Sequence, residues 1–181
     1  MSIARHLSIS LSILLPISLI YPVSSKAQKI IPPNYNFSLD SLKVFYPNRP
    51  LRGIIRRHGK GEVIKQEGDI RLMRFSVKHM RYNFHVMVQV KNNKVIDFFA
   101  SLPSYFLHDV FHQSLINRFG KQTRYFHQEN SAVYLWKNKR GMDFIYRATC
   151  TITCFPIFLA GRSSKKNPSS SFIEQITLPS P

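Results

Sequence analysis

One segment, residues 104–120, carries the apolar periodicity of an amphipathic helix, and strand-like segments lie just before and after it. Its apolar residues recur at spacings of three and four positions: Leu107, Val110, Phe111, Leu115 and Phe119. We expect these side chains to share one helix face that is buried against a sheet. Ser104 is a predicted N-terminal cap, and Gly120 can end the helix because glycine readily adopts the left-handed conformation.

Segments that alternate between apolar and polar residues flank this helix. A short segment at 62–66 precedes a turn at Glu67-Gly68-Asp69, and Asn92-Asn93 supplies residues that tolerate the positive φ of a tight hairpin. The longer predicted strands are residues 70–78, 84–90 and 95–100 before the helix, and residues 123–128, 132–137 and 142–149 after it. The order β-β-β-α-β-β-β predicts an α+β fold, in which one amphipathic helix packs on an antiparallel sheet.

Residues 1–27 have the composition of a secretory signal peptide. Arg5 and His6 precede an apolar run, and the segment ends in the small residue Ala27. A membrane anchor is the alternative, but the run is short for a membrane span and is interrupted by Pro16 and Pro22. We therefore predict cleavage after Ala27, a periplasmic or secreted protein, and no transmembrane segment in the mature chain.

Three regions follow the predicted signal peptide. Residues 28–61 contain four prolines and a cluster of basic residues, so we expect an extended arm in which residues 42–45 can form a short edge strand. Residues 62–160 are the predicted single α+β domain. Residues 161–181 are rich in serine, proline and lysine, which is typical of a tail, although residues 172–178 could dock back on the domain.

The 181 residues include 26 Lys and Arg but only 9 Asp and Glu, which gives a formal net charge of +17. Such a balance favours adhesion to polyanions, although a solvated basic surface without a dedicated ligand explains it too. The predicted arm supplies the candidate binding residues Arg49, Arg52, Arg56, Arg57 and Lys60. The candidate partners are an anionic polymer, lipid head groups or an envelope protein, because the sequence carries no helix-turn-helix, zinc-finger or RNA-binding motif.

His108 and His112 stand at positions i and i+4 of the predicted helix, the spacing by which a helix offers two ligands to one zinc ion. The segment resembles the HExxH motif in this spacing only, because Asp109 takes the place of the glutamate. Alternatively, both rings flank the buried stripe and pack against it while their nitrogens stay in water. We assign no metal or cofactor on this pattern.

A small, basic and secreted chain with several histidines also fits a nuclease or hydrolase that uses general acid–base catalysis. The candidate groups are His85, His127 and Glu129, with Arg124 or Lys137 as the cation. Their spacing does not select them, and the sequence lacks a glycine-rich phosphate loop, a serine nucleophile elbow and paired catalytic carboxylates. An enzyme is therefore the less favoured hypothesis.

Cys150 and Cys154 are the two cysteines of the chain, and exported proteins normally oxidise such a pair. On a straight strand their Cα atoms would lie about 13 Å apart, which is beyond disulfide reach. A bond therefore requires residues 151–153 to curl into a loop or a helical turn. We predict this disulfide, as a local staple because its loop is short.

The helix end Arg118-Phe119-Gly120-Lys121, followed by an aromatic strand ending at Trp136, resembles small periplasmic envelope-assembly domains of the BamE type. A glycine stop before a hairpin is common in proteins, so no functional residue is carried over. The sequence as a whole predicts an exported, non-enzymatic binding protein of the envelope or extracellular space. The alternative is a small secreted basic hydrolase or nuclease.

Overall fold

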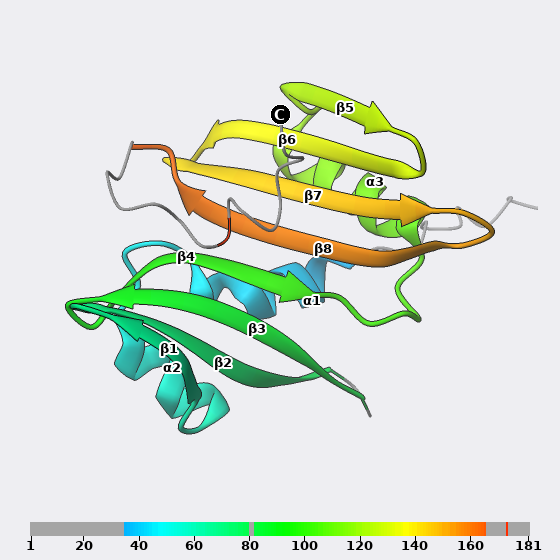
Figure 1. Cartoon of the computed structure of the whole chain (residues 1–181). Helices are drawn as coiled ribbons and strands as arrows, with labels where there is room; N and C mark the ends of the chain where they lie inside the picture. The colour runs from blue at the N-terminus through cyan, green and yellow to red at the C-terminus, as the bar shows by residue number, and fades with distance from the viewer. Residues whose placement is uncertain (1–34, 80–81, 166–172, 174–181) are drawn as a thin grey trace, which may run out of the picture. The chain divides into compact units, whose positions relative to one another are not determined.

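A computed structural model describes residues 35–79, 82–165 and 173 of the chain (Figure 1). The predicted signal peptide lies outside the described residues, as does most of the predicted tail. The elements are α1 (Asn36–Ser41), a 3₁₀ helix η1 (Leu42–Phe45), α2 (Leu51–His58), β1 (Glu62–Glu67), β2 (Ile70–His79), β3 (Tyr82–Lys91), β4 (Lys94–Ser101), α3 (His108–Phe119), β5 (Arg124–Gln128), β6 (Ser131–Lys139), β7 (Met142–Cys150) and β8 (Cys154–Ser163). No helix among the described residues has both the length and the apolar character that a membrane crossing requires.

The described strands form one sheet of eight strands in the order β1-β2-β3-β4-β8-β7-β6-β5. All neighbouring strands are antiparallel. Four consecutive strands, β1 to β4, therefore make one half of the sheet, and β5 to β8 make the other. The two halves join where β4 pairs with β8. The prediction of an antiparallel sheet with helical elements is confirmed, but the sheet is larger than the sequence pattern indicated.

The expectation of a single helix is wrong, because α1, η1 and α2 occupy the segment that we expected to be an extended arm. Pro50 directly precedes α2, a position where its missing N–H leaves no helical hydrogen bond unmade. Residues 42–45 form the 3₁₀ helix rather than an edge strand. Leu42 and Phe45 of η1, with Leu51 and Ile54 of α2, are buried in the core. The described part of this segment, from residue 36 to residue 58, thus belongs to the folded body.

The helix α3 is shorter than predicted and begins at His108. Ser104 does not cap it, because Ser104 lies in a turn closed by a hydrogen bond from the Phe106 N–H to the Pro103 carbonyl. Leu107 precedes the helix and is 63% exposed, so the prediction that it is buried is wrong. Phe111 and Leu115 are fully buried, as expected of the apolar face. Gly120 ends the helix as predicted, with a positive φ of 78°, but its ψ of −170° differs from that of the left-handed helical conformation we expected.

The strand β8 was not predicted, and it includes Gly161, Arg162 and Ser163, which we placed in the tail. Glycine is required at 161 because an added Cβ would collide with the ring of Phe98 on the neighbouring strand β4. Ile173, which lies within the segment expected to dock back, is 3% exposed and belongs to a hydrophobic cluster. The described body therefore extends beyond the predicted boundary at residue 160.

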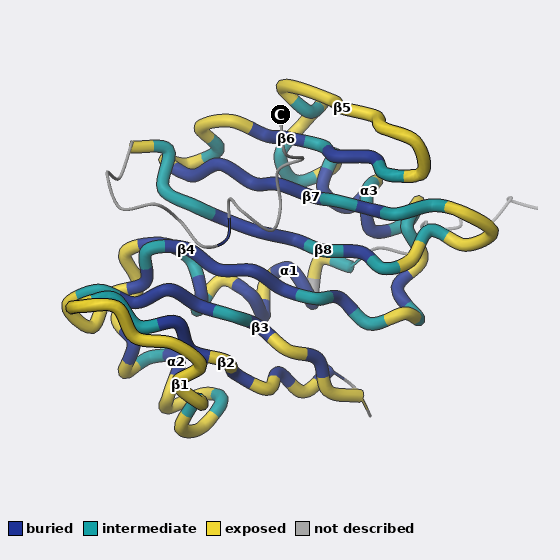
Figure 2. Tube along the Cα trace, in the orientation of Figure 1, coloured by how far each residue is buried: buried dark blue, intermediate teal, exposed yellow. Residues whose placement is uncertain are grey.

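The main core lies between one face of the sheet and the helices, which Figure 1 shows on a common side. A second, smaller cluster of buried residues uses the opposite face: Phe99, Val133, Leu135, Ile145, Ala160 and Ile173. Phe98 belongs to the first cluster and Phe99 to the second, because successive side chains of a strand point to opposite faces. Figure 2 shows that the two edge strands, β1 and β5, are exposed along their whole length.

Candidate functional site

Five cations gather on and beside α2, and we call them the α2 basic surface: Arg49, Arg52, Arg56, Arg57 and Lys60. All five are exposed to solvent. The helix buries Leu51 and Ile54 on its other side, at 5% and 0% exposure. Arg52, Arg56 and Arg57 therefore lie on the outer side of an amphipathic helix whose apolar side packs in the core. Arg49 precedes this helix and Lys60 follows it.

The acidic residues that follow α2 do not neutralise this surface. Glu62 accepts hydrogen bonds from the Arg74 guanidinium, at 2.6 Å to Nη2, and Glu67 pairs with Lys65. Asp69 pairs with the Lys91 ammonium at 3.2 Å. Within the described part of the chain, none of the five cations of the α2 basic surface takes part in an ion pair. Their positive charge therefore remains uncompensated.

The helix α2 is fixed to the hairpin between β3 and β4. The Leu51 N–H donates to the Asn93 carbonyl at 2.8 Å, and Pro50 forms a β-bridge with Lys94. The Arg71 guanidinium adds a 2.9 Å hydrogen bond to the Asn93 side-chain oxygen. These contacts hold the helix at its first turn, so the backbone that carries the cations is ordered before any ligand arrives.

His58, the last residue of α2, does not add to the positive charge near neutral pH. Its ring stacks on Phe45 with the centroids 5.1 Å apart. Burial lowers the pKa of His58, and the nearby Arg57 guanidinium lowers it further. The charge of the α2 basic surface at pH 7 therefore comes from its four arginines and its lysine rather than from His58.

The histidines of α3 form a second cluster, which packs on tyrosines of the sheet. The rings of His108 and His112 lie parallel, with an angle of 9° between planes and 5.8 Å between centroids. The Tyr146 hydroxyl is hydrogen-bonded to His108 Nδ1 at 2.8 Å. The centroid of the Tyr134 ring lies 4.1 Å from that of the His112 ring. The stacked rings turn their faces toward each other, and Nδ1 of His108 is hydrogen-bonded to Tyr146.

Burial governs the protonation of this cluster. It lowers the pKa of His108 and of His112, and for His112 the neighbouring His108 lowers it further. The Asp109 carboxylate opposes both shifts but does not reverse them. Burial also raises the pKa of Tyr146, so this phenol stays protonated at physiological pH. The cluster therefore adds little charge at pH 7.

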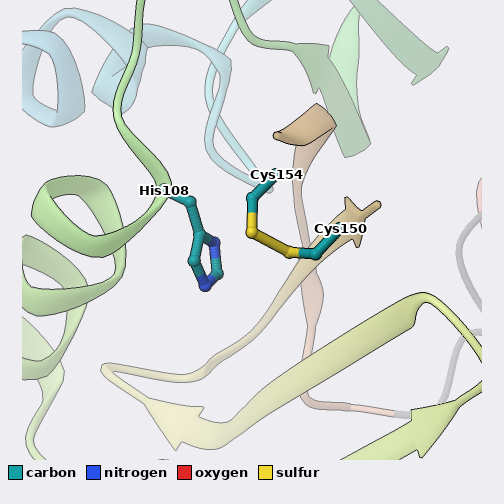
Figure 3. Close-up of side chains that lie close together, drawn as sticks. All are labelled: His108, Cys150 and Cys154. Carbon is teal, nitrogen blue, oxygen red and sulfur yellow. A yellow bond between two sulfur atoms is a disulfide. The ribbon is translucent and has the colours of Figure 1, made fainter. Parts of the chain in front are cut away.

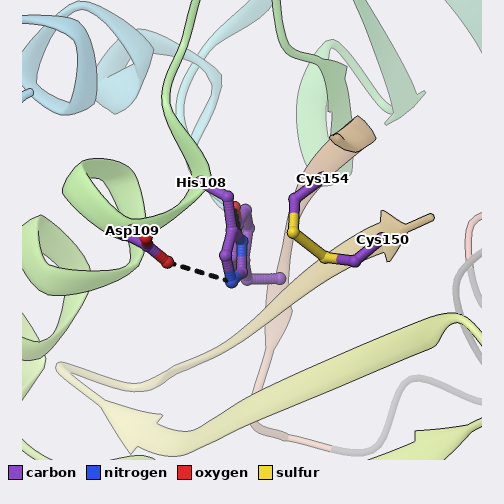
Figure 4. The surroundings of a disulfide bond; sticks show 5 residues. His108, Asp109, Cys150 and Cys154 are labelled. Carbon is purple, nitrogen blue, oxygen red and sulfur yellow. Dashed lines mark hydrogen bonds and ion pairs between the residues drawn. A yellow bond between two sulfur atoms is a disulfide. The ribbon is translucent and has the colours of Figure 1, made fainter. Parts of the chain in front are cut away.

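The predicted disulfide between Cys150 and Cys154 is present, and it joins the end of β7 to the start of β8. Residues 151–153 curl and bring the two Cα atoms to 3.8 Å from each other, in place of the separation that a straight strand would impose. A ring nitrogen of His108 and the two sulfur atoms all lie within 4.8 Å of one another (Figure 3). Figure 4 shows Asp109 and the disulfide on opposite sides of the His108 ring, with 3.9 Å between Asp109 Oδ1 and His108 Nε2.

The structure does not assemble the predicted nuclease residues. His85 lies on β3, whereas His127 lies on β5 and Glu129 follows it in a turn. Four strands separate β3 from β5, which corresponds to about 24 Å at the usual spacing of neighbouring strands. Arg124 on β5 and Lys137 on β6 are near His127 in the sheet order but remote from His85, because at least three strands separate them from β3. These groups cannot act together on one phosphate.

The aromatic partners of the α3 histidines were missed at the sequence level. Tyr134 and Tyr146 were assigned only to strands, although their alternation with Leu135 and Ile145 already placed them on one sheet face.

No model of a known protein family, no curated protein and no solved structure matches this chain.

Proposed function

We propose that this protein is an exported, non-enzymatic binding domain of the cell envelope or extracellular space, and that the α2 basic surface contacts its partner. The partner is an anionic polymer or a surface of anionic lipid head groups. One observation supports this proposal above all: five exposed cations lie on and beside one short helix, and no described carboxylate pairs with them.

The packing of α2 supports an electrostatic mode of contact. An amphipathic helix that inserts into a bilayer needs a free apolar face, but here Leu51 and Ile54 are used by the core. Contact with phosphate or carboxylate groups therefore depends on the guanidinium and ammonium groups themselves. Their binding releases counterions from the partner, so the affinity falls steeply as the salt concentration rises.

A binding assay with matched variants tests the proposal. The probes are fluorescent inorganic polyphosphate and vesicles that contain phosphatidylglycerol, each at about 50 and about 200 mM salt. The variant Arg52→Ser/Arg56→Ser/Arg57→Ser should weaken binding to one of these probes about tenfold or more. The control Lys121→Ser/Arg124→Ser/Lys137→Ser removes the same charge from exposed positions near β5 and should change binding less than about threefold.

The outcomes of this assay separate the hypotheses. Equal losses in the two triple variants would mean that only net charge matters, which would contradict a role for the α2 basic surface. Binding to neither probe at about 50 mM salt would contradict the proposed partner class and point to an envelope protein instead. A preference for one probe would identify the polymer or the lipid surface.

The export part of the proposal rests on the composition of residues 1–27 and is tested separately. The mature protein, recovered from its native compartment, should begin at Gln28 when sequenced from its N-terminus. A mature chain that still begins at Met1 would contradict the cleaved signal peptide.

The hydrolase alternative has less support, because the sheet order keeps His85 away from His127 and Glu129. Highly purified protein incubated with RNA and DNA between about pH 5 and 8 should give no products. Products that disappear in a His127→Ala variant, but persist in the Arg52→Ser/Arg56→Ser/Arg57→Ser variant, would favour the enzyme over the binding domain.

A further inference from the structure

We propose that reduction of the disulfide creates a metal site, in which the thiolates of Cys150 and Cys154 and the imidazole of His108 bind a divalent ion such as Zn²⁺. The disulfide and the metal complex would then be alternative states of one site. This inference is independent of the α2 basic surface, which lies on and beside a helix, whereas the disulfide joins β7 to β8.

The positions of the donor atoms carry the proposal. The two sulfur atoms and the ring nitrogen of His108 lie within 4.8 Å of one another. In a tetrahedral zinc site, with Zn–S bonds of about 2.3 Å and Zn–N bonds of about 2.1 Å, the donor atoms stand about 3.5–3.8 Å apart. Reduction removes the covalent bond and lets the two sulfur atoms separate to this spacing. Only small side-chain movements are therefore needed to enclose an ion.

Two contacts with Tyr146 fix the orientation of the His108 ring. Its Nδ1 is hydrogen-bonded to the Tyr146 hydroxyl at 2.8 Å, and Tyr146 itself is fully buried. The His108 ring also stacks on Tyr146 with 5.6 Å between the centroids. The His108 side chain is only 12% exposed. A hydrogen-bonded partner of this kind is what positions a ligating histidine in known metal sites. The imidazole is thus held beside the sulfur atoms before a metal arrives.

The donor set and the solvent access define the class of ion. Two thiolates and one imidazole favour Zn²⁺ and similar ions over Mg²⁺ and Ca²⁺, which prefer oxygen ligands. The site has three protein donors, and Cys150 and Cys154 are both partly exposed. The fourth position is therefore open to water, with the exposed Asp109 carboxylate 3.9 Å from His108 Nε2. His112, the other histidine of the helical pair, is not part of the group.

The switch between the two states balances as a thiol–disulfide exchange. A dithiol reductant delivers two electrons and two protons to the Cys150–Cys154 bond and is itself oxidised to a disulfide. The ion then displaces the two thiol protons as it binds. Residues 151–153 are exposed, so a reductant can approach the bond from solvent. Because the metal binds only the reduced form, it should protect the thiols against reoxidation.

Cobalt titration of the mature chain tests the site. Without oxygen, the protein reduced with a phosphine should bind one equivalent of Co²⁺ and show the absorption of thiolate-bound cobalt. The oxidised protein should show neither. His108→Ala and His108→Gln should each weaken binding about tenfold or more, whereas His112→Ala should change it less than about threefold. Circular dichroism of every variant checks that it is folded.

Two results would overturn the proposal. The first is a reduced wild-type protein that is folded but binds no Co²⁺ or Zn²⁺ at micromolar concentration. The second is a folded His108 variant that binds Co²⁺ as tightly as the wild type, because the two thiolates would then act without the imidazole. The comparison of the oxidised and reduced wild-type protein needs no variant, so poor folding of a mutant cannot obscure the outcome.

Discussion

The side-chain hydroxyl of Ser38 lies 2.8 Å from Nε2 of His79, although 41 positions separate the two residues in the chain. The other ring nitrogen, Nδ1, lies 2.7 Å from the hydroxyl of Tyr105. Ser38 belongs to α1, His79 ends β2, and Tyr105 lies in the turn before α3. Ser38 and His79 are 3% and 7% exposed, so the network joins three segments inside the fold rather than facing a substrate.

The variant His79→Phe should lower the free energy of unfolding by about 1–3 kcal/mol, because it leaves a buried hydroxyl without its hydrogen-bond partner. The exposed His85 on β3 supplies the matched control, and His85→Phe should change stability by less than about 0.5 kcal/mol. Urea unfolding monitored by Trp136 fluorescence measures both. Equal effects of the two substitutions would show that the network does not stabilise the fold.

Acidification should destabilise the protein between about pH 7.5 and about pH 5. Burial lowers the pKa of four histidines in the folded state: His58, His79, His108 and His112. The unfolded chain, with histidine pKa values near about 6.5, then binds more protons than the folded chain as the pH falls, so the free energy of unfolding decreases. Urea titrations across this range measure the effect, and a stability that rises on acidification would contradict it.

Strands β2, β3 and β4 were predicted from the sequence because their apolar and polar residues alternate regularly. Asn92 and Asn93 indeed form the turn of the β3–β4 hairpin, both with positive φ, at 50° and 57°. The helix α2 was missed because it has only two buried residues and contains Gly53. The strand β8 was missed because Pro156 and Gly161 are both unusual inside a strand.

The parts of the candidate sites were predictable to different extents. Arg52 and Arg56 were selected by local charge alone, and charge patterning needs no knowledge of the fold. The disulfide followed from there being two cysteines in a chain expected to be exported. The approach of His108 to Cys150 and Cys154 depends on how α3 packs against the β7–β8 turn. Such long-range packing leaves no signal in residue spacing, so that group could not be found from the sequence.

Leu107 and Leu115 were both expected on the buried face of one helix, but only Leu115 is buried in the structure. Leu115→Ala should lower the free energy of unfolding by about 2–5 kcal/mol, because the site is fully buried and the substitution leaves a cavity. Leu107→Ala should change it by less than about 0.5 kcal/mol, since that side chain is 63% exposed. Thermal and urea unfolding of both variants check this. A similar cost at both positions would contradict the described boundary of α3.

Gly53 and Gly161 should respond in opposite ways to substitution by alanine. At Gly53, within α2, an added Cβ meets only Val44 at 3.9 Å, so Gly53→Ala should stabilise the protein by about 0.5–1 kcal/mol. At Gly161 the same methyl group collides with Phe98, so Gly161→Ala should destabilise it by about 1–3 kcal/mol. Differential scanning calorimetry distinguishes the two directions. Stabilisation at 161 would contradict the tight β4–β8 contact.

Because the two halves of the sheet join through β4 and β8, they cannot form one sheet until β8 has been synthesised. Among the described strands, β8 (Cys154–Ser163) is synthesised last, and it lies in the middle of the sheet between β4 and β7. Until β8 is synthesised, β4 and β7 each have one unpaired edge. Unpaired edges readily pair with strands of other chains. A nascent chain released before Cys154 would therefore have two separate parts of the sheet, each with an exposed edge that is prone to aggregation, and would not behave as a slightly shortened protein.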